Sequence, residues 1–133
     1  MSAGGYRGYV AARPVQGSRV PQHVQNLVIR DYAQRHALAY KLSGTEYAMP
    51  GCYMMLADLL DELPALDGII AYTIFMLPEA RERRRTVYRR VIEAGKSLHG
   101  AVEGLCVASW DDAQRIEDIW LVQQALDRRP AEA

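Results

Sequence analysis

The dozen residues LSGTEYAMPGCY, at positions 42–53, concentrate hydroxyl, carboxylate and thiol groups between an apolar strand candidate and an apolar helix candidate. In open α/β sheets, ligands bind where the carboxyl ends of strands meet the N-termini of helices. Polar groups crowded into such a segment therefore predict a binding or active site. The candidate catalytic residues are Glu46, Cys52 and Ser43.

These reactive groups also have structural interpretations. Glu46 suits general acid or base chemistry if apolar neighbours raise its pKa toward neutrality, and a solvated loop carboxylate fits the pattern equally well. Cys52 follows Pro50-Gly51 at an expected helix N-terminus, where partial positive charge favours the thiolate. A buried cysteine that acts as a small hydrophobe is nonetheless the commoner case.

Candidate ligand-binding residues are expected at the same edge of the sheet. Arg13 comes just after the first strand, and its guanidinium suits a carboxylate or a phosphate on a sugar. An ion pair with Glu46 or Glu103 is the alternative. Tyrosine rings could stack on a sugar face or fill the core. The predicted ligand-binding residues are Arg13, Tyr47, Tyr53, Tyr72 and Glu103.

Strand and helix patterns alternate along the chain and must position these residues. Strands are predicted at residues 9–12, 38–42, 69–74 and 98–102. Helices are predicted at about 22–36, from 51 to the stop at Pro64, at 78–94 and at about 109–128. The expected core stripe of the first helix is Val24, Leu27, Val28, Tyr32 and Ala33. This order predicts one α/β domain over residues 1–133, with a small, mainly parallel four-stranded sheet, helices on both faces and a C-terminal helix.

Length and composition narrow the class of protein. The 133 residues suffice for one domain, and 16 basic against 16 acidic side chains leave no long-range field toward nucleic acid, so no nucleic-acid partner is expected. No apolar run reaches the roughly 18 to 20 residues of a spanning helix, and no signal pattern opens the chain. We therefore expect a cytoplasmic protein without membrane insertion. Two cysteines and three histidines lack ligand spacing, so no metal site or cofactor is expected.

Two helices carry unusual patterns. Arginines at positions 81, 83, 84, 85, 89 and 90 predict a solvated helix face with i, i+4 pairing, rather than a phosphate or nucleic-acid site. The last helix has apolar residues on more than one stripe, which favours a homodimer or a higher homo-oligomer. Its apolar residues are Ile116, Ile119, Trp120, Leu121, Val122 and Leu126.

A series of landmarks runs through residues 6–107: Gly8-Tyr9-Val10, Gln25 before Leu27, Leu42-Ser43-Gly44, Pro50-Gly51, Leu59-Leu60 and residues 67–72. Their order resembles the catalytic domain of the serine recombinases, the resolvase and invertase family. The resemblance implies a small, mainly parallel α/β fold. The family's nucleophilic serine does not carry over, because Arg13 stands at its place and Ala11 stands where an arginine is expected. We also find no helix-turn-helix module, so recombination is not expected.

A second resemblance covers the whole chain. It rests on Tyr6-Arg7-Gly8-Tyr9, Arg13-Pro14, Phe75-Met76-Leu77-Pro78, Leu98-His99 and, above all, residues 43–55 with the run EYAMPGCYM. These motifs resemble the sporadic carbohydrate cluster family, small proteins encoded among bacterial genes for surface-polysaccharide and unusual-sugar synthesis. The resemblance implies a role in cell-surface glycan biosynthesis and supplies no catalytic residues.

Two classes of function remain open from the sequence. In the first, the protein binds or acts on an anionic sugar or nucleotide-sugar intermediate at the strand-end rim. In the second, it is a non-catalytic homo-oligomeric scaffold or regulatory protein derived from a serine recombinase fold. Whether the chain is an enzyme is left open, because nothing in it fixes a reaction.

Overall fold

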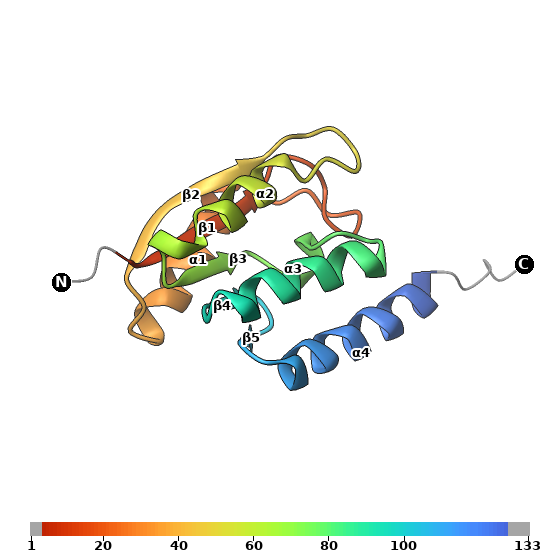
Figure 1. Cartoon of the computed structure of the whole chain (residues 1–133). Coiled ribbons are helices and arrows are strands. Elements are labelled where there is room, and N and C mark those ends of the chain that lie inside the picture. The colour runs from red at the N-terminus through yellow and green to blue at the C-terminus, as the bar shows by residue number, and fades with distance from the viewer. Residues whose placement is uncertain (1–3, 128–133) are drawn as a thin grey trace, which may run out of the picture.

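A five-stranded sheet in the order β2-β1-β3-β4-β5 forms the centre of the structure, a computed structural model that describes residues 4–127 (Figure 1). The first four strands are parallel, and the last is antiparallel to its neighbour. The strands are β1 (Tyr6–Ala11), β2 (Tyr40–Glu46), β3 (Gly68–Ala71), β4 (Ser97–Gly100) and β5 (Leu105–Val107). The predicted α/β class with a mainly parallel sheet is confirmed.

Helices cover the two faces of the sheet unequally. The helix α1 (Gln22–Arg35) packs Ile29 and Tyr32 against Val10 on one face. The other three helices bury the opposite face, which Tyr9 joins because successive strand residues point to opposite sides. They are α2 (Met54–Asp61), α3 (Arg81–Glu93) and α4 (Trp110–Asp127), and α3 and α4 run side by side (Figure 1). The predicted end of the last helix near residue 128 lies outside the described residues.

The sheet has one strand more than the four predicted. The strand expected at 98–102 ends at Gly100, because residues 101–104 form a turn in which Gly104 adopts a φ of 68°. The chain then returns as β5, which has three residues and is too short for periodicity to reveal. The strand expected at 69–74 also stops early, because Thr73 accepts a hydrogen bond from Phe75 N and begins a 3-10 helix (Ile74–Met76).

The strand β2 extends further than its apolar pattern indicates. It runs beside β1 from the pair Tyr6 and Tyr40 to the pair Ala11 and Glu46. Residues 43–46, which look like the start of a polar loop, therefore belong to the sheet. Backbone pairing with a central strand outweighs the weak strand propensity of this sequence.

The buried stripe of α1 differs from the predicted one. Leu27 is 60% exposed, whereas Gln25 and Ile29 are buried. The amide of Gln25 accepts a hydrogen bond from Ala11 N and donates one to Ala11 O, both at 2.9 Å. A polar residue thus takes a core position because its side chain pairs with the end of β1 as a backbone group would.

A small polar cluster lies on the same face, beside α1. His99 Nδ1 is 2.7 Å from Tyr32 Oη, and its Nε2 is 3.0 Å from Ser97 Oγ and 3.7 Å from Cys106 Sγ. Burial, followed by the nearby His36, lowers the pKa of His99 to about 4. Burial also raises the pKa of the Cys106 thiol. The imidazole and the thiol are both neutral at pH 7, so this cluster joins β4, β5 and α1 without a charge.

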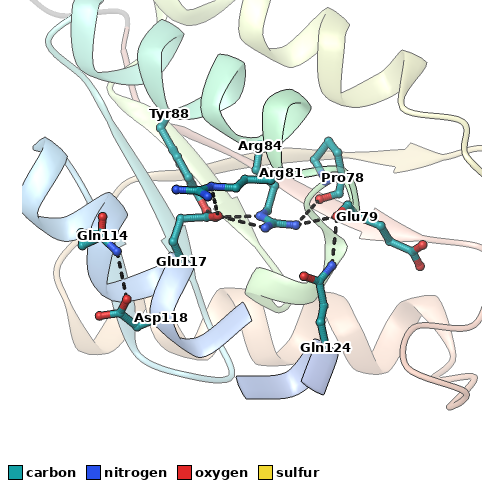
Figure 2. A network of polar contacts seen from close by, with 9 residues as sticks. All are labelled: Pro78, Glu79, Arg81, Arg84, Tyr88, Gln114, Glu117, Asp118 and Gln124. Carbon is teal, nitrogen blue, oxygen red and sulfur yellow. Dashed lines mark hydrogen bonds and ion pairs between the residues drawn. The ribbon is translucent and has the colours of Figure 1, made fainter. Parts of the chain in front are cut away.

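The arginine-rich helix α3 does not present all its arginines to solvent, contrary to the prediction for Arg84. Its side chain is 1% exposed, and its Nε and Nη2 donate to the Glu117 carboxylate at 2.7 and 2.9 Å (Figure 2). Its Nη1 donates to the carbonyls of Pro78 and Glu79 at 3.1 and 2.7 Å. The guanidinium also lies 4.3 Å from the Trp120 ring centroid. One residue thereby connects α3, α4 and the loop before α3.

The carboxylate of Glu117 is ionised in this network. Burial alone would raise its pKa, but the hydrogen bonds from Arg84 and Tyr88 outweigh burial and lower it. Burial and the same Glu117 contact raise the pKa of Tyr88, which stays a neutral donor. The pair therefore carries one buried positive and one buried negative charge, each satisfied by the other.

Breaking this pair should destabilise the fold. Glu117→Gln leaves a buried guanidinium without its counter-charge, and we expect the free energy of unfolding to fall by about 3–5 kcal/mol. Urea unfolding measures the change, and Arg89→Ala, on the exposed side of α3, should stay within about 0.5 kcal/mol of the wild type. A loss below about 1 kcal/mol for Glu117→Gln would contradict this account of the pair.

Candidate functional site

A groove runs along the edge where the parallel strands end. Two cavities of about 390 and 550 Å³ adjoin there and share four lining residues: Arg13, Pro14, Tyr53 and Glu79. We call the pair the rim groove. Its loop end is also lined by Ala48, Pro50, Gly51, Ala80 and Arg83, and its α4 end by Gln16, Phe75, Trp120, Gln123, Gln124 and Asp127. Cavities of this size hold small molecules.

Arg13 ties the loop after β2 to the end of β1. Its Nη1 donates to the carbonyls of Cys52, Met49 and Tyr47 at 2.7, 3.1 and 3.3 Å. Among residues 4–127 it forms no ion pair with Glu46 or Glu103, the two partners considered for it. Arg13 lies at the rim as predicted, and one guanidinium nitrogen is engaged in holding the loop.

Two guanidinium groups lie against the ring of Tyr53. The Cζ atoms of Arg13 and Arg83 are 4.8 and 5.0 Å from the ring centroid, within cation–π range. Arg83 is exposed at the start of α3 and forms no ion pair within the described part of the chain. The ring therefore places two positive charges at the loop end of the rim groove.

Glu46 lies beneath this rim, fully buried at the end of β2. Its carboxylate accepts hydrogen bonds from Tyr9 Oη at 2.7 Å and from the backbone N–H groups of Tyr47, Met55 and Leu56 at 3.0–3.2 Å. Two of these N–H groups belong to the first turn of α2, which has no other side-chain cap. The carboxylate thus joins β1, β2 and α2 at one point.

The pKa of Glu46 moves in the direction opposite to the one a general acid requires. Burial would raise it, but the hydrogen bonds from Tyr9 and the backbone outweigh burial and lower it. Burial and the bond to Glu46 in turn raise the pKa of Tyr9. Glu46 is therefore an ionised structural anchor. The raised pKa that acid–base chemistry would require is not found, and the buried strand position also contradicts the alternative of a solvated loop carboxylate.

The other two candidate catalytic residues occupy different places. Cys52 is half-buried just before α2, and its Sγ lies 3.7 Å from Glu46 Oε2. Ser43 lies within β2 on the face covered by α1, where its Oγ is 2.7 Å from Tyr40 Oη and 2.6 Å from Asn26 Oδ1. The structure brings Cys52 next to Glu46 and leaves Ser43 away from the rim groove.

The remaining predicted ligand-binding residues are split between two places. Tyr72 and Glu103 line a separate cavity of about 230 Å³, which shares Val15 and Gln16 with the α4 end of the rim groove. The Glu103 carboxylate accepts hydrogen bonds from Thr73 Oγ1 and from Ile74 N. Tyr47 is exposed on the loop after β2 and lines none of these cavities.

Sequence reasoning missed most of the α4 end and the second arginine. The arginine run predicts a solvated helix face for Arg83, and the apolar pattern of the last helix gives no sign of its polar residues at the groove. Glu79 follows the third strand in the loop before α3, at the carboxyl edge of the sheet, and this position was the available signal. Trp120 came to line the groove because its ring packs under Arg84 and at 5.1 Å from Phe75.

We compared the chain with models of protein families, with curated proteins and with solved structures. None of them matches. The likeness to the sporadic carbohydrate cluster family and to the resolvase fold therefore stays a prediction, drawn from motifs in the sequence alone.

Within the described residues, no group of three or more His, Cys, Asp or Glu side chains is placed to hold a metal ion. None of the helices between residues 4 and 127 combines the length and the apolar character that a membrane crossing needs.

Replacing the buried carboxylate should loosen the rim. Glu46→Gln puts an amide NH2 among groups that donate, so we expect the free energy of unfolding to fall by about 2–3 kcal/mol at pH 7. Because folding lowers the pKa of Glu46 below its ordinary 4.5, its contribution is present above that pH and is lost as the pH falls further. Urea unfolding measures this at pH 7 and pH 4. The difference in the free energy of unfolding between the wild type and the variant should be smaller at pH 4.

The matched control for this measurement is Glu62→Gln. Glu62 forms an exposed ion pair with Arg7, so its replacement should cost less than about 1 kcal/mol. Equal losses in the free energy of unfolding for the two variants would contradict this account, because Glu46 would then stabilise the fold no more than an exposed carboxylate does.

Proposed function

We propose that the protein binds an anionic sugar or nucleotide-sugar intermediate of bacterial surface-polysaccharide or unusual-sugar synthesis, in the cytoplasm, and that the rim groove is the site. The observation that carries this proposal is the pair of guanidinium groups on the Tyr53 ring. Arginine binds phosphate and carboxylate groups through charge-assisted, often bidentate hydrogen bonds. The likeness of residues 43–55 to the sporadic carbohydrate cluster family supports the choice of a sugar.

The geometry favours binding over turnover. Glu46 is saturated with donors, and Ser43 is remote from the groove, so two of the three candidate catalytic groups are not placed to meet a ligand. Cys52 does not line the rim groove, although its neighbours Gly51 and Tyr53 do. A ligand-binding role therefore needs fewer assumptions than a catalytic one.

A ligand screen by thermal shift tests the proposal. Nucleotide-sugars, sugar phosphates and acidic sugars are added to the wild type, to Arg83→Gln and to the control Arg89→Gln on the same helix. A ligand that binds only the folded state at one hundred times its Kd should stabilise the wild type by about 2.7 kcal/mol. We expect Arg83→Gln to weaken binding about tenfold because one charged partner is lost, and the control to leave binding unchanged.

Two outcomes would count against the rim groove. Absence of any shift across the panel would remove the proposed function. A shift that survives Arg83→Gln at full strength would place the ligand elsewhere.

A second candidate function, a homo-oligomeric scaffold, is favoured by the exposed side of α4. Leu121, Val122 and Leu126 are 54%, 62% and 51% exposed there. Apolar groups gathered on one helix face are typical of a surface that another protein covers. The same helix lines the rim groove with its other side, so scaffolding and ligand binding are compatible.

Light scattering after gel filtration tests the scaffold. We expect the wild type to form a dimer or larger oligomer, and the double variant V122K/L126K to be monomeric because it places two charges in the contact. Leu27→Lys, an equally exposed apolar position on α1, is the control and should keep the wild-type mass. A monomeric wild type at high protein concentration would exclude the homo-oligomer.

A further inference from the structure

The two ends of the rim groove carry opposite charge. Arg13, Tyr53 and Glu79 line both ends, so they do not distinguish them. The loop end adds Arg83, which gives it two guanidinium groups and one carboxylate. The α4 end adds Asp127 instead, which gives it two carboxylates and one guanidinium among residues 4–127. A ligand with charge at one end would therefore have a preferred direction in the groove.

Hydrogen bonds already made at the α4 end leave mostly acceptors for a ligand. Gln123 donates from Nε2 to Asp127 Oδ1, and Gln124 donates from Nε2 to the Glu79 carbonyl, both at 3.1 Å. The amide oxygens of both glutamines and the carboxylates of Glu79 and Asp127 then remain as acceptors. Each glutamine NH2 keeps a second N–H, but the free acceptors outnumber these donors. A group that can donate is therefore favoured at this wall, and a hydroxyl can donate whereas a carboxylate cannot.

The same wall holds one buried donor. Trp120 lines the α4 end, and its buried indole N–H has no hydrogen-bond partner among the described residues. That N–H is buried beyond the reach of a ligand, so the polar contacts of a ligand at this wall are with the carboxylates and amides, to which a hydroxyl can both donate and accept. The half-buried ring of Phe75 adds an apolar surface of the kind that packs against the C–H groups of a sugar ring.

Resting on the proposed function, we infer that the groove binds a neutral sugar with its charge confined to a phosphate at one end. The phosphate, from a sugar 1-phosphate or from a nucleotide diphosphate, lies at the loop end with Arg83 and Arg13. The hydroxyl groups of the neutral ring lie at the α4 end. Sugars with a ring carboxylate are rejected, because that carboxylate would face Glu79 and Asp127.

Pairs of ligands that differ by one group test the inference by titration calorimetry. Glucose 1-phosphate is compared with glucuronic acid 1-phosphate, and UDP-glucose with UDP-glucuronate. In each pair a CH2OH group becomes a carboxylate. In the pair that the protein recognises, we expect the neutral sugar to bind at least about tenfold more tightly than the acidic sugar. The carboxylate of the acidic sugar would be repelled by Glu79 and Asp127, whereas the neutral sugar carries no such charge. Which pair binds distinguishes a sugar phosphate from a nucleotide-sugar.

Three variants locate the discrimination. Asp127→Asn should strengthen binding of the acidic sugar, so the two dissociation constants within a pair should move closer together. Arg83→Gln should weaken the binding of both ligands of a pair by the same factor, so the ratio of their dissociation constants should not change. The control Asp118→Asn changes an exposed aspartate of α4 that also accepts from a glutamine, Gln114, but lies outside the groove (Figure 2). It should leave both affinities unchanged.

The outcomes separate this inference from the proposed function. Equal or tighter binding of the acidic sugars by the wild type, unaltered by Asp127→Asn, would overturn the inference and leave an anion-binding groove in place. Absence of binding for every ligand, in both pairs and in the wider panel, would overturn the inference together with the proposed function.

Discussion

A guanidinium that is taken out of water must keep its counter-charge, and the shape of the rim groove follows from that requirement. Arg84 meets it with the Glu117 carboxylate of α4, and its remaining hydrogen bonds fix the carbonyls of Pro78 and Glu79 (Figure 2). The two walls of the α4 end, the loop before α3 and the helix α4, are therefore held at one distance. The ion pair that stabilises the fold therefore also fixes the distance between these two walls of the rim groove.

The opposite wall depends on charges that are satisfied in a similar way. Glu46 gathers a phenol and backbone N–H groups around one carboxylate, while Arg13 gathers three carbonyls around one nitrogen. Arg13 holds the loop after β2 through one nitrogen, and Glu46 holds the two ends of that loop, at Tyr47 and at the first turn of α2. A loop fixed from both sides is a rigid support for Tyr53, so the ring and its guanidinium partners are positioned before any ligand arrives.

The sequence predicted the class of fold because long periodic segments and their alternation carry that information. The helices starting near residues 22 and 109 and the central strand all appear close to their expected places. Arg13, Cys52, Tyr53 and Glu46 lie together at the edge where a site was predicted, and the site itself stays a prediction. The roles could not be predicted, because the pKa of Glu46 depends on donors brought from β1 and α2. Arg84 shows the same limit, since its partner Glu117 lies on another helix.

The rim groove is built from segments that lie far apart in the sequence, from Arg13 after the first strand to Asp127 at the end of the last described helix. A ribosome makes the segment around Arg13 before most of the sheet, and it makes Asp127 after the other described strands and helices. The strand-end loops could meet early, but their outer wall is absent until α4 has been made and has docked on α3. The rim groove is thus complete only after α4 has docked, and a product that stops short of α4 would keep the described sheet without the outer wall of the groove.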